Sequence, residues 1–175
     1  MVSQNLLSTL PFAVIGFAAR SGTGKTTLLK QLIPELKSRG LRLGLIKHTH
    51  HRIQFDNAGL TRRVFAQGVD VIARADNICL AEWHHDDAEN ALEQGIEAYR
   101  HLPIDLLLIE GFKRHALPKI ELHRSKLNAP LLYPHDPGIV AVASDDANLD
   151  SGGLPLLPLN DASAIADWLL ARLVV

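Results

Sequence analysis

The segment ARSGTGKT (residues 19–26) constrains the fold most, because it joins an apolar run to a helical pattern. Residues 12–18 (FAVIGFA) have the composition of a buried parallel strand. Residues 25–38 carry leucine or isoleucine at helical spacing and end just before Gly40. Phosphate-binding loops with the pattern G-x-x-x-x-G-K-[ST] connect a strand to a helix in this way. The segment therefore predicts a nucleotide-binding loop, although Ala19 stands where the pattern has its first glycine.

The groups that contact phosphate or metal in such a loop are all present. The chemistry needs backbone N–H groups around the phosphate oxygens, a lysine for the outer phosphates and a hydroxyl for Mg²⁺. Lys25 supplies the amine and Thr26 the hydroxyl, whereas Ala19 lies at the strand exit and adds only a methyl group. We predict a catalytic role for Lys25. The predicted nucleotide-binding residues of the loop are Ser21, Gly22, Thr23, Gly24, Lys25, Thr26 and Thr27.

The rest of the chain alternates between strand and helix patterns. Further strands are predicted at residues 41–47, 69–74, 77–83, 104–109, 118–124 and 138–143, and further helices at 58–67, 86–101 and 161–174. This order predicts a doubly wound, mainly parallel α/β sheet. With 175 residues and neither a repeat nor a linker, we expect one domain over residues 1–175, with residues 1–10 as a poorly ordered lead-in.

Composition excludes several classes of partner. The formal net charge of -1 gives no overall attraction to nucleic acid. The apolar runs fall far short of the roughly 20 residues that cross a bilayer, so we expect no membrane partner. The N-terminus lacks a basic region and a cleavage site, and Cys79 is the one cysteine. Both observations favour a cytoplasmic protein.

Glu110 is predicted to face the phosphate loop. The carboxyl ends of parallel strands meet at one edge of a sheet, so residues 19–26, 47–52 and 110–114 should open on the same crevice. Glu110 directly follows the most apolar strand, DLLLI, and we predict that it holds Mg²⁺ with Thr26 and acts in catalysis. The alternative is a surface acid at a strand end. Asp105 begins the same strand and should lie at the opposite edge.

A group of cationic residues follows the second strand. Lys47, His48, His50 and His51 belong to the sequence KHTHH, and His48 and His50 share a face of an extended chain. We predict that these residues contact an anionic substrate. A transition-metal site and solvated loop histidines are the alternatives. Residues 113–115 (KRH) add positive charge at the same edge, so Lys113 is expected to contact a second phosphorylated ligand.

Several of these segments together resemble one known family. They are SGTGKTTLL, LGLIKHTHH, a D-x-x-G at residues 56–59, DLLLIEGFKR and GIVAVASD. In this order they resemble the molybdopterin-guanine dinucleotide biosynthesis protein B (MobB) family. The resemblance implies a phosphate-loop NTPase fold like that of the signal-recognition and nickel-insertion GTPases. It also implies GTP and Mg²⁺ binding with weak hydrolysis, molybdopterin as second ligand and a homodimer that assists the guanylyltransferase MobA in attaching GMP to molybdopterin.

The resemblance leaves the base and the role of Asp56 open. Leu60 to Arg63 replace the polar stretch that usually follows the D-x-x-G of the family. The guanine-reading N-K-x-D motif is absent, and Asp145, after the strand GIVAVA, is the residue predicted to accept hydrogen bonds from guanine; a turn-forming role is the alternative. Two other functions remain. They are an ATP-dependent small-molecule kinase and a metal-delivery GTPase that uses the KHTHH histidines.

Overall fold

The computed structural model describes residues 4–47, 67, 71–74, 79–82 and 91–173. The chain forms two compact units, residues 1–48 with 92–175 and residues 49–91. The single domain over residues 1–175 therefore stays a prediction.

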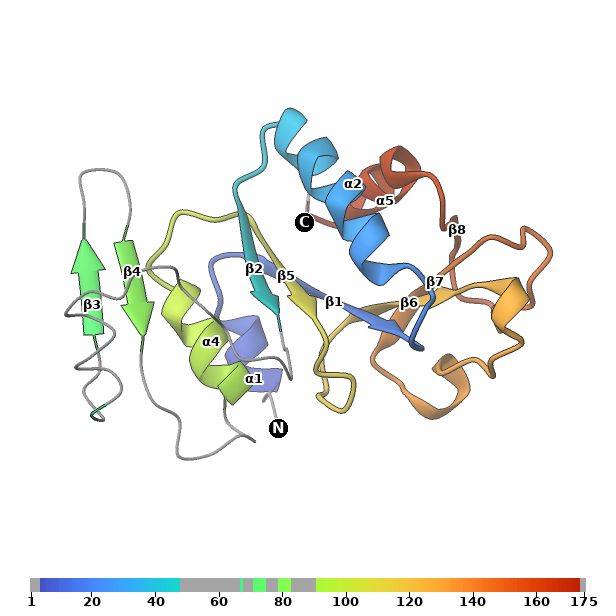
Figure 1. Ribbon diagram of the computed structural model, residues 1–175, viewed down its shortest axis with the longest axis horizontal. Helices are drawn as coiled ribbons and strands as arrows, with labels where there is room; N and C mark the ends of the chain where they lie inside the picture. Colours follow the sequence, from blue (N-terminus) through green and yellow to red (C-terminus); the bar gives the residue numbers. More distant parts are fainter. Residues whose placement is uncertain (1–3, 48–66, 68–70, 75–78, 83–90, 174–175) are drawn as a thin grey trace. The chain divides into compact units, whose positions relative to one another are not determined.

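A six-stranded sheet with the order β2-β5-β1-β6-β7-β8 is the centre of the first unit (Figure 1). All of its neighbouring strands are parallel. The strands are β1 (Ala13–Ala19), β2 (Leu43–Lys47), β5 (Leu106–Glu110), β6 (Lys119–His123), β7 (Ile139–Ser144) and β8 (Leu156–Pro158). The predicted α/β fold with a mainly parallel sheet is confirmed. Only β8 was not predicted, since its short sequence LLP is flanked by turn residues.

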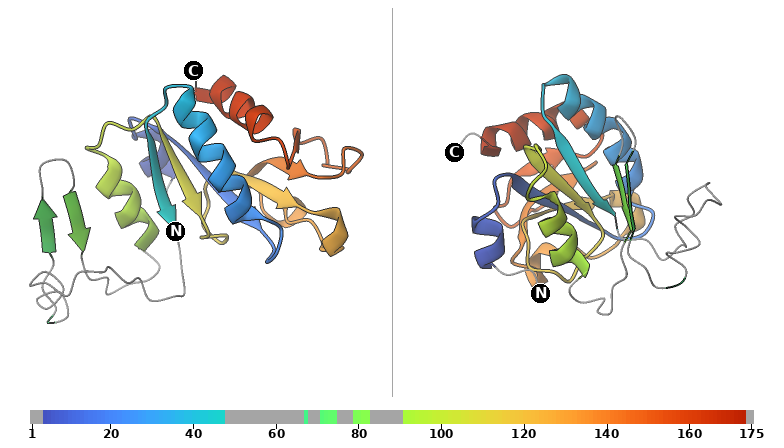
Figure 2. Two further views of the ribbon diagram at one scale, coloured as in Figure 1. Left: turned by 45° about the horizontal axis from the view of Figure 1, so that its top comes forward. Right: turned by 90° about the vertical axis from the view of Figure 1, so that its left-hand side faces the viewer.

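Helices cover both faces of this sheet (Figures 1 and 2). Helices α2 (Lys25–Ser38) and α5 (Ala162–Leu173) cover one face, and α1 (Gln4–Ser8) and α4 (Ala91–Tyr99) cover the other. Two short 3₁₀ helices, Ser125–Leu127 and Tyr133–His135, lie in the loops that follow β6. Helix α1 was not predicted; it lies within residues 1–10, where we expected a poorly ordered lead-in.

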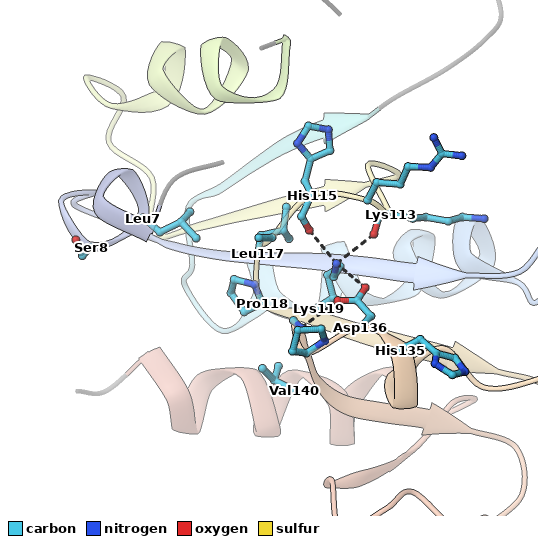
Figure 3. A pocket seen from close by; sticks show the side chains of 14 residues that line it. Leu7, Ser8, Lys113, His115, Leu117, Pro118, Lys119, His135, Asp136 and Val140 are labelled. Atoms are coloured by element: carbon cyan, nitrogen blue, oxygen red, sulfur yellow. Dashed lines mark hydrogen bonds and ion pairs between the residues drawn. The ribbon is translucent and has the colours of Figure 1, made fainter. Parts of the chain in front are cut away.

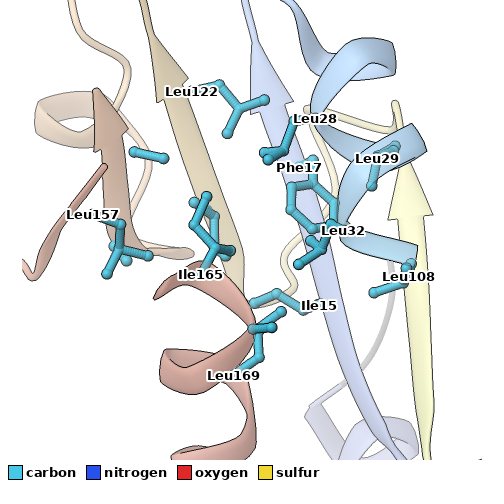
Figure 4. Close-up of a cluster of buried hydrophobic side chains, with 14 of the residues drawn as sticks. Ile15, Phe17, Leu28, Leu29, Leu32, Leu108, Leu122, Leu157, Ile165 and Leu169 are labelled. Atoms are coloured by element: carbon cyan, nitrogen blue, oxygen red, sulfur yellow. The ribbon is translucent and has the colours of Figure 1, made fainter. Parts of the chain in front are cut away.

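The alternation of side chains along β5 divides the core in two. Leu106 and Leu108 pack with α2 and α5, whereas Leu107 and Ile109 pack with α4 and the N-terminal segment. All four side chains are at most 1% exposed, which explains why this strand has an unbroken apolar sequence. Figure 4 shows the first of the two clusters, with side chains of α2 and α5 directed toward the strands.

Local signals in the sequence fix the ends of α2 and α5. Helix α2 ends at Ser38, and Gly40 follows with a φ of 87°. Asp161 caps α5, since its Oδ1 accepts a hydrogen bond from the backbone N–H of Ala164 at 3.0 Å. Both helices therefore occupy nearly the predicted ranges.

The second unit contains an antiparallel strand pair, β3 (Val71–Arg74) and β4 (Cys79–Glu82). This pair agrees with the two strands predicted at residues 69–74 and 77–83. The helix predicted at residues 58–67 lies outside the described residues, apart from Gln67.

Candidate functional site

The candidate site lies at the carboxyl edge of the parallel sheet. Strand β5 runs between β1 and β2, with Glu110 in register with Phe17 on one side and with Lys47 on the other. Figure 2 shows these strands pointing the same way. The phosphate loop leaves β1 at Ala19, so three segments that are distant in sequence end at one place, as the sequence predicted.

The phosphate loop has the backbone that an anion site needs. Gly22 and Gly24 have φ values of 80° and 101°, a region that residues with a side chain rarely adopt. Helix α2 begins at Lys25, and among the described residues no side chain caps its first turn. The free N–H groups of that turn and the helix dipole are therefore available to phosphate oxygens. Thr23 is buried, and its hydroxyl donates to the carbonyl of Arg20 at 2.8 Å, which fixes the turn.

Glu110 contacts the loop and the second strand together. The hydroxyl of Thr26 donates to Glu110 Oε1 at 3.4 Å, and Lys47 Nζ lies 3.3 Å from Oε2. Glu110 is only 8% exposed. A hydroxyl and a carboxylate at this distance are hard oxygen ligands of the kind that Mg²⁺ takes beside phosphates. The residues present thus fit a magnesium ion.

Lys25 lies close enough to Glu110, Lys47 and Lys113 for their charges to affect its pKa. Burial lowers the pKa of Lys25 below its ordinary value; the Glu110 carboxylate opposes this effect, and the charges of Lys113 and Lys47 add to it. Lys25 therefore interacts with one carboxylate and two further cations, and this excess of positive charge suits an anionic ligand.

Asp145 lies away from Glu110, beyond β6, because β6 separates β1 from β7. It accepts hydrogen bonds from the backbone N–H of Ser125 at 2.8 Å and from Arg124 at 3.3 Å. These bonds, first that of Ser125, lower the pKa of Asp145. Asp145 also lines a cavity of about 390 Å³ with Asn160 and the end of β8.

The structure describes only some of the remaining predicted site residues. Ser21 and Thr27 are exposed near the two ends of the phosphate loop. Lys113 is exposed in the loop after β5. His48, His50 and His51 lie outside the described residues, and so does Asp56.

Arg124 is a site residue that the sequence reasoning missed. Its Nε donates to the carbonyl of Thr23 at 3.0 Å. Its other two nitrogens donate to Asp145 at 3.3 Å and to Asn160 Oδ1 at 3.2 Å. One guanidinium thus connects the phosphate loop to two polar side chains that line the 390 Å³ cavity. Its position directly after the strand KIELH, at the carboxyl edge, was the available signal.

The described residues lack two features that other functions would need. No group of three or more histidine, cysteine, aspartate or glutamate side chains is placed there to hold a metal ion. In the same part of the chain, no helix has the length and apolar character to cross a membrane.

Comparisons with known proteins agree on one family. The family described as MobB, molybdopterin guanine dinucleotide synthesis protein B, matches residues 14–145. A molybdopterin-guanine dinucleotide biosynthesis adapter protein of Escherichia coli K12 is 39% identical over 162 residues, which cover 90% of this chain and 91% of the relative. A protein of the same name from Haemophilus influenzae is 35% identical over 172 residues, or 97% and 94% of the two chains.

The solved structures extend the likeness to the fold. A crystal structure of Bacillus subtilis MobB superposes with a TM-score of 0.70 and covers 92% of this chain and 98% of its own, at 23% identity. The MobB homologue of Bacillus stearothermophilus gives a TM-score of 0.68 at 22% identity, covering 91% and 97% of the two chains. At these identities the likeness shows the fold alone, which is of the phosphate-loop NTPase type.

Proposed function

The chain belongs to the MobB family, and on that premise we propose that it is a GTP-binding adapter that assists the attachment of GMP to molybdopterin. The observation that carries this proposal is the convergence of Thr26, Glu110 and Lys47 at the carboxyl edge beside the phosphate loop. The names of the relatives support the pathway.

The nucleotide binds with its phosphates on the loop. Backbone N–H groups of residues 21–27 and the amine of Lys25 contact the phosphate oxygens. Thr26 and Glu110 would hold Mg²⁺, which supplies charge neutralisation between the phosphates when it is bound. The ion pair with Lys47 holds the Glu110 carboxylate in place beside the phosphate loop, where it is suited to a metal contact. We propose that hydrolysis is slow.

Guanine is read on the far side of β6. Asp145 has two carboxylate oxygens that can accept the N1 and N2 hydrogens of guanine, and it lines the 390 Å³ cavity. Arg124 fixes this carboxylate relative to the phosphate loop. The distance between base and phosphates is thereby set by one side chain.

The second ligand is molybdopterin, whose phosphate is an anion. Lys47, which pairs with Glu110, and Lys113, whose charge acts on Lys25, provide positive charge for this anion. The histidines at residues 48, 50 and 51 follow Lys47 in sequence and complete this contact in the proposal. Both ligands pass to the guanylyltransferase MobA. The chain contacts this enzyme as a cytoplasmic homodimer.

Two measurements test the proposal. Titration calorimetry should show that GTP binds more tightly than ATP and that Mg²⁺ is required for full affinity. Co-purification with the guanylyltransferase should be stronger with GTP than without it. A preference for ATP, together with no capture of the transferase in either condition, would overturn the adapter function.

A further inference from the structure

A second large cavity lies outside the phosphate-loop site. It has a volume of about 970 Å³ and lies between α1, the loop after β5 and the loop before β7 (Figure 3). None of the residues predicted for the nucleotide lines it. Of all the residues predicted for either ligand, Lys113 alone among the described ones is part of its wall.

A buried lysine forms one side of this cavity. Lys119 is 2% exposed, and its Nζ donates to the carbonyls of Lys113 at 3.2 Å and His115 at 2.9 Å. The same amine lies 2.7 Å from Asp136 Oδ2. An ammonium group has three hydrogens, so these three partners satisfy it. Figure 3 shows all three converging on Lys119.

Strand β1 leaves space for this lysine. A Cβ at Gly16 would lie 2.8 Å from Lys119 Cγ and 2.5 Å from Leu117 Cδ1, which real Cβ atoms do not tolerate. The glycine is therefore required for packing against Lys119. Lys119 in turn holds the loop that carries Lys113, because its amine donates to two carbonyls of that loop.

The wall of the cavity has an excess of positive charge. Asp136 is the one carboxylate among the described residues that line it, and the Lys119 ammonium neutralises that carboxylate. Lys113, Arg114 and His135 remain as exposed basic side chains. Because the whole chain carries a net charge of -1, this excess is local, and it favours an anionic ligand.

The cavity also has an apolar lining, which comes from Leu7, Leu117, Pro137 and Val140. In Figure 3, Leu7 and Ser8 of α1 lie at one end, and Lys113 and His135 lie at the other. A ligand that fits both ends has a phosphate group and a flat body with apolar faces.

A smaller cavity connects this surface to the nucleotide site. It has a volume of about 220 Å³, and Lys113, His135 and Asp136 line it as well as the larger cavity. Its remaining wall includes Ala18 and Arg20, where β1 enters the phosphate loop. Lys113 also acts on Lys25, since its charge lowers the pKa of that residue. The cationic end of the large cavity thus lies next to the bound nucleotide.

We propose that this cavity binds a phosphorylated ring compound, with the phosphate at Lys113 and Arg114 and the ring body between α1 and β7. The identity of that compound as the second ligand rests on the proposed function, whereas the cavity and its charge do not. Lys113 is shared between the two ligands and places their anionic groups side by side. Lys119 is a positioning residue that holds Lys113 there.

The test uses neopterin monophosphate, a fluorescent phosphorylated pterin, with the full chain. Saturable binding is expected, and unphosphorylated neopterin should bind about tenfold more weakly because a charged anchor is lost. Arg114→Ala removes a cation and should weaken binding about tenfold. Ser8→Trp fills the apolar end without a change of charge and should weaken binding about as much. Lys126→Ala, at an exposed lysine outside both cavities, is the control and should bind as the wild type does.

GTP titration of the same variants separates this proposal from the proposed function. Arg114→Ala and Ser8→Trp should bind GTP within about twofold of the wild type, which also shows that they are folded. No saturable binding of neopterin monophosphate, or equal binding by the wild type and both cavity variants, would overturn the cavity proposal. If the wild type binds neopterin monophosphate but does not bind GTP, the GTP-adapter function would be overturned instead.

Discussion

Thr26 and Glu110 are 84 positions apart in the sequence, and the Thr26 hydroxyl donates to Glu110 Oε1 across 3.4 Å. The parallel pairing of β1 with β5 brings them together, because both strands end at the same edge. The pair joins the first turn of α2 to the end of the most buried strand. An ion bound between nucleotide phosphates and Glu110 would therefore contact residues of both α2 and β5.

Lys25→Ala should weaken GTP binding while the fold survives. The substitution removes charge-assisted hydrogen bonds of about 1.5–3 kcal/mol, which corresponds to a loss of roughly tenfold to a hundredfold in affinity. Calorimetry measures the affinity, and circular dichroism checks the fold. Lys30→Ala, an exposed lysine in the same helix, should bind as the wild type does. An unchanged affinity in Lys25→Ala would refute the phosphate-loop assignment.

The affinity for inorganic triphosphate should fall at high pH, and in Glu110→Gln this fall should begin at a lower pH. The pKa of Lys25 lies below 10.5, mainly because of burial, and the cationic form is the one that binds phosphate. Affinity is therefore lost as pH rises through this lowered pKa. Glu110 raises the pKa of Lys25, so its replacement should move the loss to lower pH.

Inorganic triphosphate, titrated from pH 7 to 10.5 without magnesium, measures this effect. The titration of the ligand itself cancels when the two proteins are compared. Identical pH profiles for the wild type and Glu110→Gln would contradict the electrostatic coupling of Glu110 and Lys25.

Arg124→Ala should reduce the preference for guanine more than it reduces phosphate binding. The guanidinium orients Asp145 and Asn160 and holds the carbonyl of Thr23. Without it the ratio of GTP to ATP affinity should fall about tenfold, because a positioned hydrogen bond to a charged group contributes roughly 1.5–3 kcal/mol. The affinity for inorganic triphosphate should fall only about threefold. Parallel titrations with the three ligands measure both ratios. Lys126→Ala is the matched control, and an unaltered GTP to ATP ratio in Arg124→Ala would exclude this role.

Asp105→Asn should destabilise the fold at neutral pH but not in strong acid. Hydrogen bonds from the side chain and then the backbone of Arg42 lower the pKa of Asp105 from 3.8 to about 2. A depressed carboxyl pKa stabilises the folded state above the unfolded-state value near 3.8, and this stabilisation is lost as pH falls through about 2. The urea midpoints of wild type and variant should therefore differ at pH 7 and converge toward pH 2. A constant difference across that range would contradict the linkage.

Patterns along the chain were sufficient to predict much of this molecule. The apolar run before Glu110 predicted a buried interior strand, and the phosphate-loop pattern predicted the strand, loop and helix around Lys25. Parallel topology then predicted that Glu110 lies beside Thr26. Each of these predictions needs only local composition and one rule about strand direction.

The features that the sequence did not reveal depend on contacts that form only in the folded chain, or are too short to give a signal. Lysine is a residue type usually found at the surface, and the burial of Lys119 is possible only because carbonyls of the preceding loop and Asp136 satisfy its amine. Arg124 gains its role from the carbonyl of Thr23, about a hundred residues earlier. Strand β8 is too short to give a periodic signal. Local patterns of residue type identify none of the three.

Gly16 of β1 and Lys119 of β6 are register partners on neighbouring strands, although they are more than a hundred positions apart in the sequence. A glycine inside a strand weakens β structure, so its presence is useful while Leu117 and Lys119 occupy the space beside it. In relatives in which smaller residues replace both of these side chains, alanine or valine at position 16 becomes the better choice. We therefore expect position 16 to vary together with positions 117 and 119 over the evolution of the family, and an alignment can be read for that covariation.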